Sequence, residues 1–549
     1  MRSWRWLLTG SYAALYLCAC GGDGSSTSVA PPVASPPLTP TVQPLSFSDQ
    51  TAASGLAHAA EFDAAYMGMP SLFAGGAAVG DVDADGDLDL FIVRGDTAPN
   101  LLMLNDGSGR FTRSTANPGL DSPGGGANVK LSGPVFADMD GDGDLDLFVG
   151  GLNGEGSRLF AGDGVGGFTD VTAGSGFDSM TSDNTISSSF GDYDGDGDLD
   201  LAMAHWGTAR LASAPGETET LWRNDSAGGV IRFTAVSAAA GISAELGLNV
   251  DGKIGRDRDY SFAPNFADID DDGDLDLLIV ADFNSSRVFR NNGDGTFTNM
   301  TDPTQITDTN GMGTDIGDFD NDGRPDWFVS SINSNRLYRN MSGSLIDTPS
   351  AGVDTGSWGW GSCFADFDLD GHLDIYQTNG WISDTGASPQ EPYTADRSRL
   401  WMNDGSQIFS DAASASNIVD TVQGRAVICA DFDDDLDTDI LLLVNGSPDG
   451  AIYWDNQITS RRAISVRLNG PPSNRTGIGA RLTIETAGTT QTRWVRAGTT
   501  FTAQTAPTHV IGMGDDAQIG RLIVDWPDGR QSVITSASAG ARIVVDHPG

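Results

Sequence analysis

The chain has 549 residues, and its 75 Asp and Glu against 31 Lys and Arg give a formal net charge of −44 at pH 7. This balance excludes a nucleic-acid-binding protein, because that class needs Lys and Arg to neutralise phosphates. Hydrophobic residues make up 39% of the chain, which is enough for a core and argues against an acidic disordered tail. A chain of this length predicts two or more domains or one large repeat architecture.

The first 45 residues have the composition of a targeting segment followed by a spacer. Two arginines precede an apolar stretch that is too short to span a membrane comfortably. The Leu-Cys-Ala-Cys that ends at Cys20 resembles the lipobox of bacterial lipoproteins, in which residues 1–19 are removed as a signal peptide and Cys20 is lipidated. Residues 20–45 are rich in Gly, Ser, Thr and Pro and predict an extended linker. An ordinary signal peptide cleaved nearby is the alternative.

The lipobox implies a location for the mature chain. A lipidated Cys20 would anchor the protein to a membrane without spanning it. Gly21 stands where an inner-membrane retention signal would have Asp, which favours the outer membrane. We therefore expect an extracytoplasmic protein of the bacterial cell envelope, in contact with the membrane only through its lipid.

One acidic motif, Asp-x-Asp-x-Asp-Gly-x-x-Asp, recurs through the middle of the chain. Its first aspartates stand at 81, 138, 192, 268, 318, 366 and, in an altered copy, 431. Each copy lies between a small or apolar run and a β-rich run, and two further strand-like runs follow most copies. The unit is therefore four antiparallel strands, and seven units predict an all-β, seven-bladed β-propeller over residues 46–459. An open array of independent repeats is the alternative.

Closure of the ring is predicted from the two ends of this region. The run that begins at Phe47 looks like a fourth strand of a blade, yet it precedes the first blade. The last blade ends near Trp454 without a fourth strand of its own. We expect the N-terminal strand to complete the seventh blade, which removes two free sheet edges.

The acidic loops have the donor pattern of a calcium site. Carboxylates at positions 1, 3 and 5 of a tight loop can point at one centre, Gly at position 6 permits the turn, and position 9 adds an acid. Hard oxygen donors suit Ca²⁺ better than zinc or copper. The predicted ligands are Asp81, Asp83, Asp85 and Asp89; Asp138, Asp140, Asp142 and Asp146; Asp192, Asp194, Asp196 and Asp200; Asp268, Asp270, Asp272 and Asp276; Asp318, Asp320, Asp322 and Asp326; Asp366, Asp368, Asp370 and Asp374; and Asp431, Asp433, Asp435 and Asp439.

The predicted ions are structural and number about six or seven. The seventh loop has Leu436 where the others have Gly, and a left-handed Leu costs about 1–2 kcal/mol. We therefore expect the seventh site to be the weakest or to use another loop shape. Asx-turns that shape hairpins without a metal are the alternative for all seven loops.

Residues 460–549 have a different composition, with ten arginines and six acids. Short strands are expected at 464–468, 480–485, 492–495, 509–512, 522–526, 532–535 and 543–546. A small β-sandwich is the simplest fold for this pattern.

Two family resemblances cover most of the mature chain. The repeats resemble FG-GAP/VCBS repeats, the calcium-loop repeats also found in integrin α-subunit propellers. Residues of the last segment resemble the ASPIC/UnbV domain, which follows such propellers in the cartilage acidic protein family. The residues that carry the second resemblance are Gly477-Ile478-Gly479-Ala480, Gln491-Thr492-Arg493, Gly498, Phe501, Gln504, Gly512 and Trp526-Pro527-Asp528-Gly529. Membership implies calcium binding and extracytoplasmic adhesion or recognition, and implies no established reaction.

The remaining candidates for chemistry give no catalytic residue. The five histidines are scattered, without a metalloprotease or triad spacing. Trp206, Trp358, Trp360 and Trp381 could line a sugar-binding face, but packing between blades is the favoured interpretation. The sequence therefore favours a binding or adhesion scaffold for a protein or glycan partner. The alternative is an enzyme that processes a polysaccharide or small metabolite in the funnel of the propeller.

Two cysteines remain in the mature chain after Cys20. Cys363 and Cys429 lie three and two residues before their acidic motifs, so their side chains are expected on opposite faces of their strands. Two buried thiols are the favoured interpretation, and a disulfide, which an extracytoplasmic location permits, is the alternative.

Overall fold

The computed structural model describes residues 44–59, 73–95, 98–122, 129–207, 218–246, 259–381, 393–445, 450–498 and 500–549. The predicted signal peptide, Cys20 and most of the predicted linker lie outside these residues. Residues 42–549 form one compact unit. The α-helices within the described ranges are α1 (Thr51–Ser54) and α2 (Pro118–Asp121), and no helix found there is long and apolar enough to cross a membrane.

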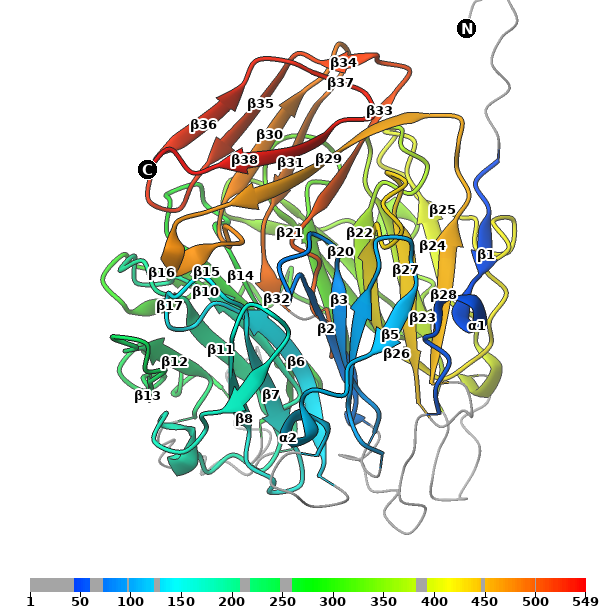
Figure 1. The fold of residues 1–549 in the computed structure, drawn as a ribbon. Helices are drawn as coiled ribbons and strands as arrows, with labels where there is room; N and C mark the ends of the chain where they lie inside the picture. The colour runs from blue at the N-terminus through cyan, green and yellow to red at the C-terminus, as the bar shows by residue number, and fades with distance from the viewer. Residues whose placement is uncertain are drawn as a thin grey trace, which may run out of the picture. The chain divides into compact units, whose positions relative to one another are not determined.

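The strands before residue 460 fall into seven groups of four antiparallel strands, of which the fifth and sixth are joined into one sheet by pairing of β19 (Asp326–Asn333) with β22 (Ser357–Ala365) (Figure 1). In chain order the groups are β2 (Gly76–Gly80), β3 (Asp89–Val93), β4 (Leu101–Asn105) and β5 (Phe111–Arg113); β6 (Leu131–Ala137), β7 (Asp146–Gly151), β8 (Arg158–Gly162) and β9 (Phe168–Asp170); β10 (Ser187–Gly191), β11 (Asp200–Ala204), β12 (Leu221–Asn224) and β13 (Phe233–Ala235); β14 (Ser261–Ala267), β15 (Asp276–Ala281), β16 (Arg287–Asn291) and β17 (Phe297–Asn299); β18 (Gly311–Gly317), β19 (Asp326–Asn333), β20 (Arg336–Asn340) and β21 (Leu345–Asp347); β22 (Ser357–Ala365), β23 (Asp374–Asn379), β24 (Arg399–Met402) and β25 (Ser410–Asp411); and β26 (Gly424–Ala430), β27 (Asp439–Val444) and β28 (Ala451–Asn456) with β1 (Phe47–Asp49).

The groups are arranged as the blades of a propeller. The first strands of successive groups, β2, β6, β10, β14, β18, β22 and β26, contact one another in chain order, and β26 contacts β2. This order is cyclic, so the first strands surround a common centre. The all-β propeller prediction is confirmed.

The ring is closed by the N-terminal strand, as the sequence predicts. β1 pairs antiparallel with β28, with Phe47 opposite Asn456 and Asp49 opposite Trp454. Phe47 is 1% exposed and packs edge-on against Phe367 of the preceding blade, with ring centroids 5.9 Å apart. The first and last parts of the ring are therefore joined in one sheet.

The core lies between neighbouring blades. One apolar cluster joins the first and second blades through Phe91 and Phe136, and another joins the second and third through Phe148 and Phe190. Each sheet thus has a neighbour on both faces, so every residue of β2 and β3 is buried. This packing explains why the inner strands are apolar without the alternation of a half-exposed strand.

The chain after β28 builds two further sheets. One has β33 (His509–Gly514), β29 (Arg462–Asn469) and β38 (Arg542–Asp546), and the other has β31 (Thr490–Trp494), β30 (Arg481–Glu485), β35 (Arg521–Asp525) and β36 (Gln531–Ile534). A two-stranded ribbon joins β34 (Gln518–Ile519) and β37 (Ala537–Ser538). An apolar core from both larger sheets, which includes Ile464, Leu482 and Trp526, gives this segment its own interior.

Candidate metal centres

All seven acidic loops share one backbone framework. The carboxylate at position 1 accepts a hydrogen bond from the backbone N–H of position 6, at 2.8–3.1 Å. The carboxylate at position 9 accepts one from the backbone N–H of position 2, at 2.7–3.2 Å. Position 9 is also the first residue of the second strand of its blade. The loop is therefore fixed at both ends before any ion is considered.

Two positions of each loop are left-handed. Position 6 has a positive φ in all seven loops. The six glycines range from 87° at Gly323 to 105° at Gly86, and Leu436 adopts the same turn with a φ of 74°. The expectation of another loop shape for the seventh copy is therefore wrong. Position 4 is left-handed as well, for example at Ala84 (59°) and Asp271 (60°), which the motif did not reveal.

The carboxylates of the repeats converge. In the first loop Asp81, Asp83 and Asp85 each offer an oxygen, and these oxygens lie within 4.8 Å of one another. In the next four loops the same holds for positions 1, 3 and 9: Asp138, Asp140 and Asp146; Asp192, Asp194 and Asp200; Asp268, Asp270 and Asp276; and Asp318, Asp320 and Asp326. These clusters could hold a metal ion.

The donor atoms fit a hard cation. Buried carboxylate oxygens of Asp81 (Oδ1), Asp270 (Oδ1) and Asp433 (Oδ1) have no hydrogen-bond partner. Burial, followed by smaller effects that include repulsion from nearby carboxylates, raises the pKa of Asp89 to about 7 and that of Asp146 to about 8. A carboxyl group buried in such a place needs either a bound proton or a nearby cation to neutralise its negative charge. An all-oxygen site with several acids matches the preference of Ca²⁺.

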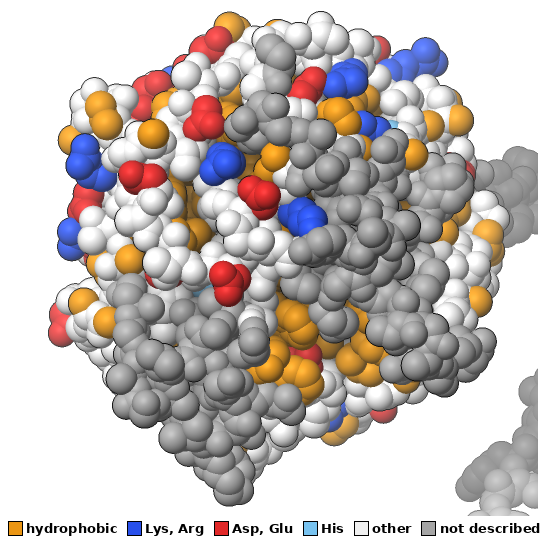
Figure 2. Space-filling view, turned by 90° about the horizontal axis from the view of Figure 1, so that it is seen from below, with side chains coloured by type: hydrophobic (Ala, Val, Ile, Leu, Met, Phe, Trp, Pro, Cys, Tyr) orange, Lys and Arg blue, Asp and Glu red, His pale blue; other side chains and the backbone are white. Residues whose placement is uncertain are grey.

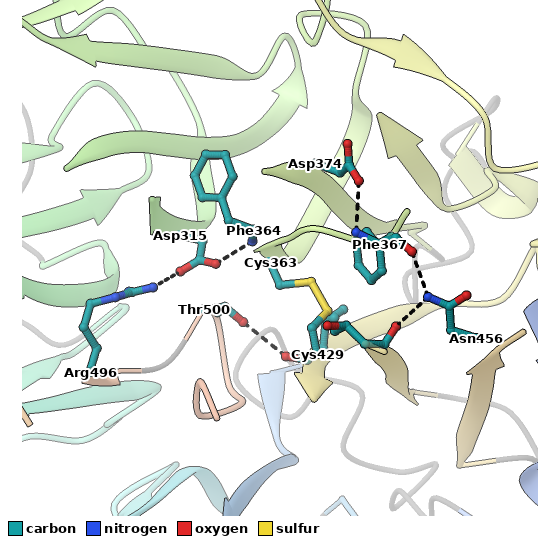
Figure 3. The surroundings of a disulfide bond; sticks show 11 residues. Asp315, Cys363, Phe364, Phe367, Asp374, Cys429, Asn456, Arg496 and Thr500 are labelled. Atoms are coloured by element: carbon teal, nitrogen blue, oxygen red, sulfur yellow. Dashed lines mark hydrogen bonds and ion pairs between the residues drawn. A yellow bond between two sulfur atoms is a disulfide. The ribbon is translucent and has the colours of Figure 1, made fainter. Parts of the chain in front are cut away.

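In six of the seven blades an asparagine at the end of the third strand links its loop to the preceding blade, and the second blade has Gly162 at this place. The backbone N–H of Asn456 donates to Asp439 (Oδ1) at 2.9 Å. The side chain of Asn456 donates to the carbonyl of Phe367 in the sixth loop at 3.0 Å (Figure 3). The same side-chain bond runs from Asn105 to Phe432, Asn224 to Met139, Asn291 to Tyr193, Asn340 to Ile269 and Asn403 to Phe319. The sequence shows this asparagine in most repeats, but its role depends on the ring.

The C-terminal sheets lie against the acidic loops and present arginines to them. Arg467 lies 3.1 Å from Asp81, and Arg461 lies 3.0 Å from Asp368. Arg481 pairs with Asp271 and Arg542 with Asp434. These contacts explain why the basic segment of the chain follows an acidic propeller.

The C-terminal segment also enters the centre of the ring, which was not predicted. β32 (Ala497–Gly498) pairs with β10 as a fifth strand of the third blade, and Ala503 forms a bridge with Ala77 of β2 (Figure 1). Phe501 is fully buried among aromatic residues from several blades. These residues lie at the centre of the ring, where the enzyme alternative would place its site.

The four tryptophans gather around Phe501. Trp358 and Trp381 stack with centroids 4.8 Å apart, and the guanidinium of Arg425 lies 4.4 Å from the ring of Trp360. Trp360 is 1% exposed, so it packs in the interior. The packing interpretation therefore holds, although these residues pack around the centre of the ring as well as between blades. Hydrophobic side chains also gather near the middle of the described face opposite the C-terminal sheets (Figure 2).

Cys363 and Cys429 form a disulfide, so the preference for two thiols is wrong. Their Cα atoms lie 6.4 Å apart, on β22 and β26 of neighbouring blades (Figure 3). The two side chains do point to opposite faces of their own sheets. Neighbouring blades pack face to face, however, so one face of the sixth blade lies against the opposite face of the seventh. The two sulfur atoms therefore meet between the blades.

A cleft of about 400 Å³ lies where the third and fourth acidic loops meet the C-terminal sheets. Trp494 and Arg481 line it from the C-terminal side, and Asp192, Asp268 and Arg324 line it from the propeller. The cleft thus combines a partly exposed indole with charged groups of both signs.

Comparison with protein families agrees with this architecture. The FG-GAP-like repeat matches residues 81–149, 138–203, 268–329 and 318–376, and the ASPIC and UnbV domain matches residues 470–549. The chain carries FG-GAP-like repeats and an ASPIC and UnbV domain. The ASPIC and UnbV domain is thus the segment that enters the centre of the FG-GAP ring.

Two relatives align with most of the chain. Cartilage acidic protein 1 of Mus musculus is 25% identical over 521 residues, which cover 88% of this chain and 74% of the mouse protein. The Homo sapiens protein is 24% identical over 519 residues, covering 88% and 73%. The resemblance to this family is confirmed.

The likenesses to solved structures are more distant. An Agrocybe aegerita lectin that recognises non-reducing terminal N-acetylglucosamine is 15% identical, with a TM-score of 0.42 over 70% of this chain and 93% of the lectin. A rhamnogalacturonan lyase of Bacillus licheniformis is 16% identical, with a TM-score of 0.36 over 69% of this chain and 71% of the lyase.

Proposed function

We propose that the protein is a calcium-binding, lipid-anchored scaffold of the bacterial cell envelope that recognises a glycan. One observation carries the proposal: seven loops repeat the same carboxylate framework, and oxygens within it are buried without a hydrogen-bond donor. Repeated binding of Ca²⁺ accounts for both features. The predicted ligands are the four aspartates at positions 1, 3, 5 and 9 of each loop.

We propose that the role of the ions is to stabilise the folded propeller. Each position-9 aspartate begins the second strand of its blade and accepts a hydrogen bond from the third, as Asp439 does from Asn456. An ion on this carboxylate therefore joins the loop to two strands. It also lowers the repulsion among acids that lie against the C-terminal domain.

The proposed location is supported by the disulfide. Disulfides persist in oxidising compartments and are rare in the cytosol. The Cys363–Cys429 bond agrees with export and with anchoring through a lipid on Cys20. Labelling with a radioactive fatty acid would test the anchor, because Cys20→Ser should abolish incorporation and release the protein from membranes.

The proposed glycan site is the cleft at Trp494. An indole offers a flat apolar face to a sugar ring, while Arg481 and the carboxylates can bond to hydroxyls. A volume of about 400 Å³ lies in the range of small-ligand sites.

A glycan array with the purified mature protein tests this function. Binding is expected in millimolar Ca²⁺ and is expected to fall in EDTA. Trp494→Ala should abolish it, whereas Trp358→Ala, a control in the aromatic cluster at the centre of the ring, should retain it. Loss only with Trp358→Ala would move the site to that cluster. Capture of a protein and no glycan would make the partner a protein, and turnover of a bound polysaccharide would support the enzyme alternative.

A further inference from the structure

The seventh acidic loop contains a fifth carboxylate that faces inward. Asp437, at position 7, is 2% exposed, and both of its carboxylate oxygens are buried without a hydrogen-bond partner. This group is not among the predicted ligands, which stand at positions 1, 3, 5 and 9 of the motif. The FG-GAP-like matches also end before this loop.

Position 7 behaves differently in five of the other loops. In the first, second, fourth, fifth and sixth loops its side chain lies at the tight turn between the third and fourth strands. A Cβ on Gly107 would come within 2.6 Å of Asp87 Oδ2, and the side chains of Asp144, Asp274 and His372 block Gly164, Gly293 and Gly405 in the same way. In the fifth loop Arg324 donates to the carbonyl of Asn340, at the start of the equivalent turn.

Ring closure explains the difference. The fourth strand of the seventh blade is β1, which comes from the N-terminal end, so no turn follows β28 within this blade. Asp437 therefore has no turn to lie over. Instead the outgoing chain covers the loop, since Ile458 and Ala463 pack with Leu436 and Leu369.

The position of Asp437 places its charge among the other acids of the loop. Burial is the main cause that raises its pKa to about 11, and the charges of Asp439, Asp435, Asp431 and Asp433 follow in that order. Tyr453 donates a hydrogen bond to Asp439 Oδ2 at 2.9 Å and so encloses the same cluster.

We propose that the seventh loop is a cation site with five carboxylates, and that it binds Ca²⁺ more tightly than the other six loops. The proposal rests on the proposed calcium function, and it reverses the sequence-based expectation that this site is the weakest. Affinity in carboxylate loops rises with the number of charged ligands. A buried fifth carboxylate adds such a ligand where the other loops offer only a backbone carbonyl.

The left-handed Leu436 does not oppose this site. Its φ of 74° matches the turn of the glycine loops, so the ligand framework is retained. The left-handed backbone of Leu436 costs about 1–2 kcal/mol in the folded chain whether or not an ion is bound. Packing of the Leu436 side chain against Leu369 and Ile458 offsets this cost.

Calorimetric titration of the metal-free mature protein with Ca²⁺ tests the proposal. The wild type should show one site of highest affinity followed by a weaker set. Asp437→Asn, which is nearly isosteric, should weaken that first site at least about tenfold and leave the weaker set in place. Asp274→Asn changes position 7 of the fourth loop, where the side chain lies outward, and should leave the titration unchanged.

A second measurement shows that the variant is folded. In EDTA at pH 8, Asp437→Asn should melt at or above the temperature of the wild type, because the buried carboxyl must take up a proton when the chain folds at this pH and the neutral amide needs none. If Asp437→Asn still showed the site of highest affinity, or if Asp437→Asn and Asp274→Asn changed the titration equally, the inference about the seventh loop would be overturned while the proposed calcium function would stand. If the wild type bound no Ca²⁺ at any loop, the proposed function itself would fail.

Discussion

Gln504 holds Phe136 by two hydrogen bonds. The side-chain oxygen of Gln504 accepts from the backbone N–H of Phe136, and its side-chain nitrogen donates to the backbone carbonyl, both at 2.9 Å. Phe136 lies on β6, an innermost strand of the ring, whereas Gln504 belongs to the ASPIC and UnbV domain. The pair shows that this domain supplies hydrogen-bond partners to the centre of the propeller and is more than an appended module.

Gln504→Ala should therefore destabilise both parts together. Two backbone groups of Phe136 and the N–H of Val79 would lose a buried partner, at a total cost of about 2–4 kcal/mol. Urea unfolding followed by tryptophan fluorescence measures the change. The control is Gln531→Ala, whose side chain makes an exposed bond to Asp525 and whose loss should cost less than about 0.5 kcal/mol. Equal midpoints for the two variants would contradict the structural role of Gln504.

The disulfide should behave as one link between two blades. Cys363→Ser and Cys429→Ser remove the same closed loop, with a sequence separation of 66 residues, and each should cost about 4 kcal/mol in the chain-entropy model. The double variant should then be no less stable than either single one. Thermal melting of the three variants, beside the wild type with a reductant, checks this result. Additive losses, or two titratable thiols in the native wild type, would show that the bond is absent.

Asn456→Ala tests the asparagine that joins neighbouring blades. The substitution leaves the buried carbonyl of Phe367 without its side-chain donor, which should cost about 1–3 kcal/mol. Asn292→Ala is a matched control, because Asn292 bonds to Thr296 in an exposed turn. Comparable unfolding midpoints for both variants would remove the asparagine from the account of ring stability.

Stability of the calcium-free protein should fall as pH rises. Burial raises the pKa of Asp89 to about 7, that of Asp146 to about 8 and that of Asp200 to about 9, above the usual value near 4 in the unfolded chain. A raised pKa means that the folded state favours the protonated form. These groups therefore stabilise the fold most at low pH, and that contribution is lost as pH rises through about 7 to 9.

Calcium should weaken this dependence, because a bound cation replaces the proton on the same carboxylates. Urea midpoints at pH 5.5 and 8.5, measured in EDTA and in Ca²⁺, give the comparison. The expected result is a steep fall in EDTA and a shallow one in Ca²⁺. Parallel lines in the two conditions would count against ligation by the position-9 aspartates.

The repeat pattern predicted most of the propeller because its signals are local. The acidic loop, the strand after it and the N-terminal strand at Phe47 can each be recognised from neighbouring residues, and the structure places them as expected. All seven strands expected in residues 460–549 are also found, for example β30 at Arg481–Glu485.

The errors and omissions concern contacts that exist only in the closed ring. Cys363 and Cys429 looked incompatible on single strands, yet they meet because two blades face each other. Gln504 and Phe501 carried the family resemblance, but nothing near them in the chain shows that they enter the ring. Asp437 faces inward because the fourth strand of its blade comes from residues almost 400 positions earlier.

The central claim is that calcium in the repeated loops stabilises the propeller, and thermal unfolding with and without the ion tests it most directly. The mature protein is melted in a scanning calorimeter at pH 7.5 in EDTA, in millimolar Mg²⁺ and in millimolar Ca²⁺. Several sites, each contributing about 2.7 kcal/mol at one hundred times its dissociation constant, should raise the Tm by about 10 °C or more in Ca²⁺. Magnesium should raise it much less, because it demands octahedral geometry and keeps its waters. Coincident melting curves in EDTA and Ca²⁺ would contradict the account.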